Sequence, residues 1–288
     1  MKVAIATDSN SGITQAQGKE LGVFVLPLPF MIDGKEYLDD ITLTQEGFYQ
    51  KLEEDADVCT SQPSPEAVMG FWEEILKEYD ALVYIPMSSG ISGSCQTARM
   101  LAEDYEGKVY VADNHRVSIT QRQSVLDALK MAEAGMTAEE IWKKLEETGP
   151  DSTIYIMVDT LKYLKKGGRL TPAVAAIGTL LRIKPVLTIQ GEKLDSYAKA
   201  RTLKQSKSMM ISAIQNDMAS RWGDTDGSKC TIQVAHSCNE EEALLLKAEL
   251  QEVFPKAEDI LINPLALSVA CHIGPGSLAI AASKKVEL

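Results

Sequence analysis

Segment 88–94 of this 288-residue chain, Ser-Ser-Gly-Ile-Ser-Gly-Ser, holds the residues whose types and spacing most clearly predict chemistry. It follows a continuous apolar run, 81–87, that is typical of a parallel strand buried on both faces. It precedes an expected helix that continues to about residue 105. Free backbone N–H groups and hydroxyls at the carboxyl end of such a strand lie where open α/β folds bind ligands, so the segment predicts an anion site.

Ser92 also raises an alternative, a lipid-ester or thioester hydrolase with Ser92 as nucleophile and His272 as its base. A nucleophile elbow has the pattern Gly-x-Ser-x-Gly, which the sequence Gly-Ile-Ser-Gly-Ser at 90–94 does not match. The sequence identifies no acidic residue that would orient His272 as the third member of a triad. The hydrolase therefore stays open as the alternative to a binding site.

Other catalytic and cofactor signatures can be excluded. Segment 274–279 fits Gly-x-Gly-x-x-Ala, but the chain ends nine residues later, so no βαβ unit can follow. The chain has no Gly-x-x-x-x-Gly-Lys-Ser/Thr loop and no His-Glu-x-x-His motif, and its three histidines lie far apart in the sequence. We therefore expect no metal, no bound nucleotide and no other cofactor.

Three further polar features have ordinary structural interpretations when each is taken alone. The loop Thr60-Ser61-Gln62-Pro63-Ser64 is typical of a turn and helix cap. His272 lies in an apolar, glycine-punctuated stretch, where a histidine usually belongs to the core. Arg201 follows an expected strand and would ordinarily be a surface charge.

Composition narrows the class of protein. Hydrophobic residues make up 45% and charged residues 24% of the chain, which excludes a disordered or collagen-like protein. The net charge of −12 argues against nucleic-acid binding, which requires a basic surface. The five cysteines form no Cys-x-x-Cys pair, and we find neither a signal peptide nor an apolar run of 18 residues. These features predict a cytoplasmic protein without a transmembrane segment.

The charge is unevenly distributed. Residues 162–207 contain eleven Lys or Arg and two acidic residues, which gives this segment a charge of +9. The rest of the chain must therefore carry −21, because the total is −12. A basic segment in an acidic protein predicts a surface that binds an anion or a partner. A helix face that is only solvated is an alternative of equal weight.

The first half of the chain alternates strands with helices. Strands are expected at 3–7, 81–87 and 109–112. Helices are expected after Thr14, at 45–54 with Thr44 as the N-cap, from Ser64-Pro65, and at 138–147, where Thr137 and Glu140 form a capping box. Pro27 and Pro29 interrupt the apolar run 23–32, which favours an edge or irregular strand. This alternation predicts a three-layer α/β/α domain with a parallel sheet over residues 1–150.

The second half follows a different pattern from about residue 150. Strand 153–158 is followed by a short helix at 161–166 and by a hairpin of strands 184–189 and 193–199. A helix at 203–221 and strands at 231–235, 260–262 and 277–282 complete the chain. We expect a second α/β domain with a mixed sheet over residues 151–288.

Six segments together resemble one known family. They occur in order along the whole chain: Thr7-Asp8-Ser9, Thr60-Ser61-Gln62-Pro63-Ser64, Ser88-Ser89-Gly90-Ile91-Ser92-Gly93, Lys166-Gly167-Gly168-Arg169, Ala200-Arg201-Thr202 and His272-Ile273-Gly274-Pro275-Gly276. Each segment alone is weak evidence for a family, but six segments in the same order along the chain are specific evidence. The chain resembles the DegV family, and within it the fatty-acid-binding subunits of bacterial fatty acid kinase.

The resemblance implies a two-domain DegV-like fold with a long-chain fatty acid, such as palmitate, stearate or oleate, between the domains. It implies that the hydroxyls of Thr60 and Ser92 hold the carboxylate, with His272 and Arg201 in the same neighbourhood. The chain itself would be non-catalytic. A separate ATP-dependent kinase would phosphorylate the bound acid, and the acyl phosphate would enter phospholipid synthesis.

The residue chemistry agrees with this implication, because a carboxylate has only acceptor oxygens and needs hydroxyl or cationic donors. Lys165, Lys166 and Arg169 beside the Gly-Gly turn would then meet the kinase or the transferred phosphate. The sequence departs from relatives at Cys95, where Thr is common, and at Cys271, so we expect a change in the shape of the pocket. A lipid-sensing regulator that uses residues 162–207 is a third hypothesis.

Overall fold

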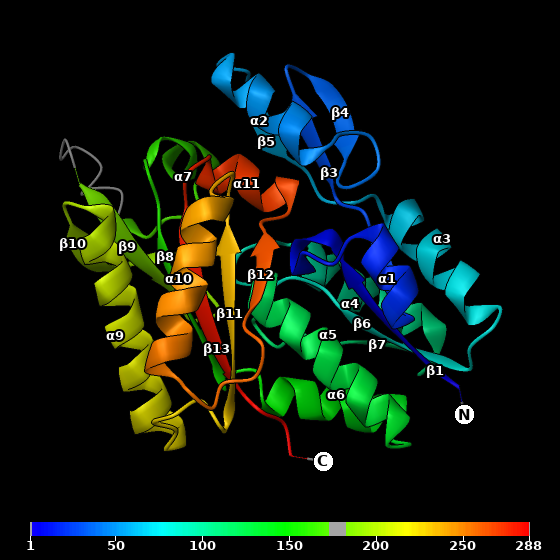
Figure 1. Cartoon of the computed structure of the whole chain (residues 1–288). Coiled ribbons are helices and arrows are strands. Elements are labelled where there is room, and N and C mark those ends of the chain that lie inside the picture. The colour runs from blue at the N-terminus through cyan, green and yellow to red at the C-terminus, as the bar shows by residue number, and fades with distance from the viewer. Residues whose placement is uncertain (1, 173–182, 288) are drawn as a thin grey trace.

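The computed structural model describes residues 2–172 and 183–287, which form three β-sheets with helices packed around them (Figure 1). Within these residues, no helix is both long and apolar enough to cross a membrane. The predicted division at residue 150 falls between helix α6, which ends at Glu147, and strand β8, which begins at Ser152.

The first half of the chain forms a four-stranded parallel sheet with helices on both faces. Its strands, in the order β2-β1-β6-β7, are Phe24–Leu26, Val3–Asp8, Ala81–Ile85 and Val109–Val111. Alternate residues of these strands point to opposite faces. Ile5 and Val83 pack with α5 (Ser118–Glu133) and α6 (Ala138–Glu147). Leu82 and Tyr84 pack with α3 (Pro65–Leu76) and α4 (Ser94–Ala102). The three-layer α/β/α prediction is confirmed.

A six-stranded mixed sheet follows. Its strands, in the order β10-β9-β8-β13-β11-β12, are Asp195–Ala200, Lys184–Ile189, Ser152–Met157, Leu278–Lys284, Cys230–His236 and Leu261–Pro264. Only the pair β11 and β12 is parallel, so the predicted mixed sheet and the β9–β10 hairpin are both confirmed. Helices α9 (Leu203–Trp222) and α10 (Glu240–Val253) cover one face, where Tyr155 and Met157 are buried.

The other face of this sheet carries Ile154, Ile156 and Leu187, which alternate with the residues under α9. Two short helices lie near the end of β8 and β11 on this side of the molecule, α7 (Lys162–Gly167) and α11 (Leu267–Ile273). Gly168 ends α7 with a φ of 68°, the left-handed conformation that glycine adopts without strain.

A third, antiparallel sheet was not predicted. The run 23–32 divides at Pro27: β2 is an edge strand of the parallel sheet, as expected, but β3 (Pro29–Ile32) is the central strand of a separate small sheet. Pro29 is tolerated there because it is the first residue of the strand. The neighbours of β3 are β4 (Lys35–Leu38) and β5 (Val58–Thr60).

Helix α2 (Gln45–Glu53) covers the small sheet, and the apolar contact continues into α11. Phe30 and Phe48 are fully buried and belong to one cluster with Leu267 and Ala270 of α11. The small sheet is therefore fixed against the helix that carries His272, although the two segments lie more than 200 residues apart in the sequence.

Short elements and caps complete the description. The remaining helices within the described residues are η1 (Ser9–Ser11), α1 (Gln15–Leu21) and η2 (Glu103–Tyr105). The predicted N-caps of α1, α2 and α3 are Thr14, Thr44 and Ser64, and the side chain of each accepts a backbone N–H from the first turn of its helix.

Candidate functional site

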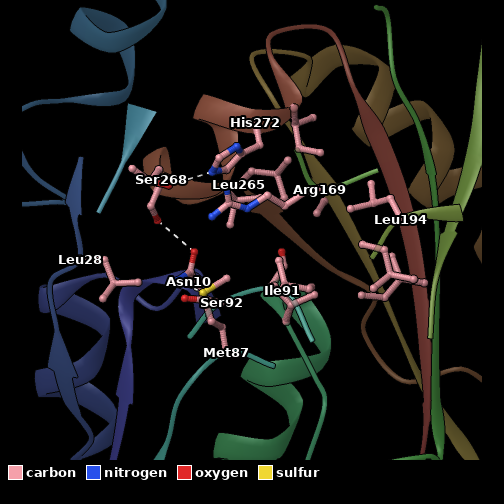
Figure 2. A pocket seen from close by; sticks show the side chains of 18 of the residues that line it. Asn10, Leu28, Met87, Ile91, Ser92, Arg169, Leu194, Leu265, Ser268 and His272 are labelled. Carbon is pink, nitrogen blue, oxygen red and sulfur yellow. Dashed lines mark hydrogen bonds between the residues drawn. The ribbon is translucent and has the colours of Figure 1, made fainter. Parts of the chain in front are cut away.

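A cavity lies between the parallel sheet and the six-stranded sheet, and it encloses about 900 Å³ when its open mouth is included. The loop after β1, the segment after β6, the end of β5 and helix α11 all contribute to its wall (Figure 2). The carboxyl ends of the parallel strands therefore meet the six-stranded sheet at this cavity, and the sequence predicted a ligand site at the end of strand β6.

Most of the cavity wall is apolar. Ile154 and Ile156 of β8, Ile189 of β9 and Ala279 of β13 line it from the six-stranded sheet. They point into the cavity because they alternate with residues that pack under α9 and α10. A surface of this kind accommodates a hydrocarbon chain and offers it no hydrogen-bond partners.

Thr60 and His272 form the first polar contact on the wall. Thr60 is the last residue of β5, and His272 belongs to α11, so the packing of the small sheet on α11 brings them together. Thr60 Oγ1 and His272 Nε2 are 2.9 Å apart, which is a hydrogen bond. Gly167 permits this placement, since a Cβ at Gly167 would lie only 2.1 Å from His272 Nδ1.

His272 is held neutral. Burial lowers the pKa of its imidazole to about 4, and the charge of Arg169 adds to the effect. A neutral imidazole has one N–H donor and one acceptor nitrogen. If Nε2 donates to Thr60 Oγ1, the hydroxyl proton of Thr60 remains available to a carboxylate in the cavity.

Arg169 lines the cavity beside His272 (Figure 2). Its side chain is half-buried, and one guanidinium nitrogen donates to the carbonyl of Gly167. The sequence suggested a partner surface for Arg169, because it follows the Gly-Gly turn. The structure instead gives the cavity a cation through Arg169.

Arg201 lies elsewhere. It is exposed and is absent from the cavity wall, where the resemblance led us to expect it. The reason is that Arg201 follows the last residue of β10, after which the chain enters α9. Helix α9 covers the face of the sheet that is opposite to the cavity.

Ser92 also lines the cavity, but it does not contact His272. Its Oγ is 3.0 Å from Ser94 Oγ and accepts the backbone N–H of Ser94 at 3.2 Å, at the start of α4. Figure 2 shows Ser92 and His272 on different walls of the cavity. With Nε2 of His272 bonded to Thr60, the hydrogen bond between serine and histidine that a hydrolase requires is not formed in this structure.

The lysines of α7 face a different direction. Lys162 forms an ion pair with Asp55 at 2.6 Å, and Lys166 forms one with Asp57. Both acids lie just before β5, so these pairs tie α7 to the small sheet. Lys165 is exposed on the same helix. Part of the basic segment is therefore neutralised by the acidic remainder of the chain.

A buried polar network behind the cavity was not predicted from the sequence. The carboxylate of Asp39 accepts hydrogen bonds from Ser9 Oγ and Ser268 Oγ, both at 3.1 Å, and from the backbone N–H groups of Leu267 and Ser268. It thereby joins the loop after β1 to the start of α11. No signal near Asp39 in the sequence identifies this role, because its partners lie 30 and about 230 positions away.

Asp8 forms a second buried carboxylate next to this network. It accepts the N–H of Met87 at 2.9 Å, the N–H of Asn10 at 3.0 Å and an amide N–H of Gln121 at 2.9 Å. Burial nevertheless raises the pKa of Asp8 to about 6. The motif Thr7-Asp8-Ser9 therefore serves to fix the segments after β1 and β6 to each other.

The two cysteine departures do not reach the cavity wall. Cys95 belongs to α4 and packs with α3 and the parallel sheet, and Cys271 belongs to α11 and packs against the small sheet. Burial raises the pKa of both thiols well above the ordinary value, which makes them unreactive. The expected effect of these residues on the pocket is therefore indirect at most, through the packing of α4 and α11.

Comparison with known proteins supports the resemblance. A family model described as "uncharacterised protein, DegV family" matches residues 2–285. A DegV domain-containing protein of Clostridium perfringens is 31% identical over 287 residues, covering 97% of this chain and 96% of its own.

Solved structures agree with this result. A DegV family protein of Thermus thermophilus, described as fatty-acid binding, is 31% identical with a TM-score of 0.90, covering 99% of this chain and 100% of its own. DegV of Bacillus subtilis, also described as a fatty acid binding protein, is 30% identical with a TM-score of 0.87, at 99% and 100% coverage. This chain belongs to the DegV family.

Proposed function

We propose that this protein binds a long-chain fatty acid, with the hydrocarbon chain in the apolar cavity and the carboxylate at Thr60, Ser92, His272 and Arg169. The observation that carries the proposal is the cavity itself, whose lining combines these polar side chains, on two of its walls, with an apolar wall of Ile and Ala side chains. The two DegV relatives described as fatty-acid binding support the same ligand class.

The polar cluster has the donors that a carboxylate needs. A carboxylate offers about four acceptor positions on two oxygens. Thr60 supplies one hydroxyl donor, and Ser92 supplies a second when its hydroxyl turns from Ser94 Oγ to the ligand. The guanidinium of Arg169 supplies two parallel N–H groups and a compensating charge. An unpaired carboxylate in such a cavity would be costly, so the cluster fixes the orientation of the ligand.

The apolar wall would supply most of the affinity. Transfer of about fifteen chain carbons from water contributes roughly 12 kcal/mol before the cost of immobilisation is subtracted, at about 0.8 kcal/mol for each CH₂ group. Palmitate, stearate and oleate are suitable probes on this basis.

We further propose that the protein is non-catalytic and presents the acid to a separate ATP-dependent kinase, which forms the acyl phosphate for phospholipid synthesis. Exposed Lys165 is the residue of α7 that we assign to the partner surface, because Lys166 is paired with Asp57 and Arg169 lines the cavity. The long-range attraction between charged surfaces would assist such an encounter.

Lipid binding can be tested directly. Mass spectrometry of the purified protein should show a retained fatty acid, and calorimetry on delipidated protein should show palmitate binding. Thr60→Ala and Ser92→Ala should each weaken binding by about 1–3 kcal/mol through the loss of a charge-assisted hydrogen bond. Ser208→Ala removes an exposed hydroxyl on α9 and is the matched control. Unchanged affinity in the double variant would contradict the head-group assignment.

The same proteins separate a carrier from a hydrolase. Turnover of an acyl ester by the wild type that disappears in Ser92→Ala would favour the hydrolase. For the kinase role, Lys165→Glu should reduce acyl-phosphate formation with the host's kinase while lipid binding persists. Lys19→Glu, an equal charge change on α1, should leave acyl-phosphate formation unaffected. Equal activity of the two variants would refute the partner surface.

A further inference from the structure

The side chain of Asn10 places a buried amide on the cavity wall, and its N–H donor has only a weak partner. Asn10 is only 2% exposed and lines the cavity (Figure 2). Its Nδ2 donates to the thioether sulfur of Met87 at 3.0 Å. A thioether is a weak acceptor, so a buried amide donor here has little compensation for the loss of water.

The other end of the amide has a stronger partner. Ser268 Oγ is 3.0 Å from Asn10 Oδ1 and 3.1 Å from Asp39 Oδ2. A serine hydroxyl has a single proton, which it can donate to only one of these two acceptors at a time. When the proton goes to Asp39, a 180° turn of the Asn10 amide lets Nδ2 donate to Ser268 Oγ instead. The end that faces Met87 and the cavity then becomes the carbonyl oxygen.

The cavity-facing end of Asn10 can thus be a donor or an acceptor. A hydroxyl group is both, so it complements either orientation of the amide. The carboxylate of the ligand does not require Asn10, because Thr60, Ser92 and Arg169 already fill its four acceptor positions. This step depends on the proposed function.

The position of Asn10 fixes where such a hydroxyl would lie on the ligand. Ser268 precedes His272 by four residues on α11, which places the two side chains one helical turn apart on the same face. A turn rises about 5.4 Å. The partner of Asn10 therefore lies a few carbon atoms from the carboxylate.

We propose that Asn10 forms a polar subsite for a hydroxyl near the carboxyl end of the ligand, so that the protein prefers hydroxylated long-chain acids to plain ones. The part of the wall that Ile154, Ile156, Ile189 and Ala279 form offers no side-chain partner for a hydroxyl farther along the chain. Preference should therefore depend on the position of the hydroxyl.

Calorimetry on delipidated protein can test this with three probes: hexadecanoic acid, 3-hydroxyhexadecanoic acid and 16-hydroxyhexadecanoic acid. The wild type should bind the 3-hydroxy acid about five- to tenfold more tightly than hexadecanoic acid, as expected for one additional hydrogen bond. It should gain nothing from the 16-hydroxy acid. In Asn10→Leu the ratio of the affinity for the 3-hydroxy acid to the affinity for hexadecanoic acid should fall to about one. Asn10→Ala provides a second variant if the larger leucine side chain disturbs the loop.

Ile91→Val is the matched control, since it alters the cavity wall without removing a polar group. Its ratio should equal that of the wild type. A wild-type ratio near one, or a ratio that persists in both Asn10 variants, would overturn the subsite. Equal weakening of both acids in Asn10→Leu would assign Asn10 to the carboxylate and would also overturn it. Failure of the wild type to bind any of the three acids would instead refute the proposed function.

Discussion

The neutral state of His272 has a consequence for the pH dependence of stability. The pKa of His272 is lowered from 6.5 to about 4 in the folded protein, mainly by burial. The unfolded chain binds a proton at the ordinary pKa, so it holds more protons than the native state between these values. Stability is therefore fully present above pH 6.5 and is lost as the pH falls toward 4.

The size of this effect follows from the two pKa values. At pH 5 the unfolded histidine is almost fully protonated and the native one is not, which costs the native state about 2 kcal/mol relative to pH 7. His272→Gln retains an amide that can reach Thr60 but does not titrate. The free energy of unfolding of the variant, measured against the wild type, should therefore rise by about 2 kcal/mol between pH 7 and pH 5.

Urea unfolding of the delipidated proteins at pH 5, 6 and 7 measures this difference. Asp8→Asn supplies a control of opposite sign, because burial raises the pKa of Asp8 to about 6 and its carboxyl stabilises the native state at low pH. The free energy of unfolding of the wild type, measured relative to Asp8→Asn, should therefore increase by about 1 kcal/mol from pH 7 to pH 5. A His272→Gln difference that is the same at all three pH values would refute a neutral, buried His272.

Three other predictions concern the elements around the cavity. Gly167→Ala places a Cβ against the ring of His272 and should lower fatty-acid affinity at least tenfold by calorimetry, because it breaks the contact with Thr60. Asp39→Ala leaves buried donors without an acceptor and should lower the free energy of urea unfolding by about 3 kcal/mol. Lys166→Ala should lower the free energy of unfolding by less than about 1 kcal/mol, and by nothing in 1 M salt, because the ion pair of Lys166 with Asp57 is exposed.

Each of these has its own control. Gly168→Asn keeps a residue that tolerates a positive φ and faces open space, so affinity should persist. Glu36→Ala removes an exposed carboxylate from the small sheet and should leave the unfolding free energy nearly unchanged. For Lys166, a loss of stability that is insensitive to salt would show that its contribution is not electrostatic.

Local signals in the sequence were sufficient for most of the secondary structure. Thr44, Ser64 and Thr137 cap helices where they were predicted to, since a capping side chain needs only the backbone of the next turn. The run 23–32 was harder, because its two halves join different sheets. Strand pairing between distant segments leaves no mark in such short strands, and the small sheet was missed for that reason.

The site was predicted in part. Thr60, Ser92 and His272 line one cavity together with Arg169, whereas Arg201 does not line it. That these residues hold a carboxylate stays a prediction. Both arginines lie in family motifs, so their types and spacing cannot distinguish them. The distinction depends on which face of the six-stranded sheet each connecting segment reaches.

By itself the sequence determined the fold class, the cap positions and the absence of a recognisable nucleotide-binding motif, because these depend on neighbouring residues and on periodicity. Only the tertiary structure decided which polar groups share a cavity. Thr60 and His272 are 212 positions apart and become hydrogen-bonded because the small sheet packs on α11. The burial that keeps His272 neutral, and that leaves Asn10 with a thioether as partner, arises from the same packing of distant segments.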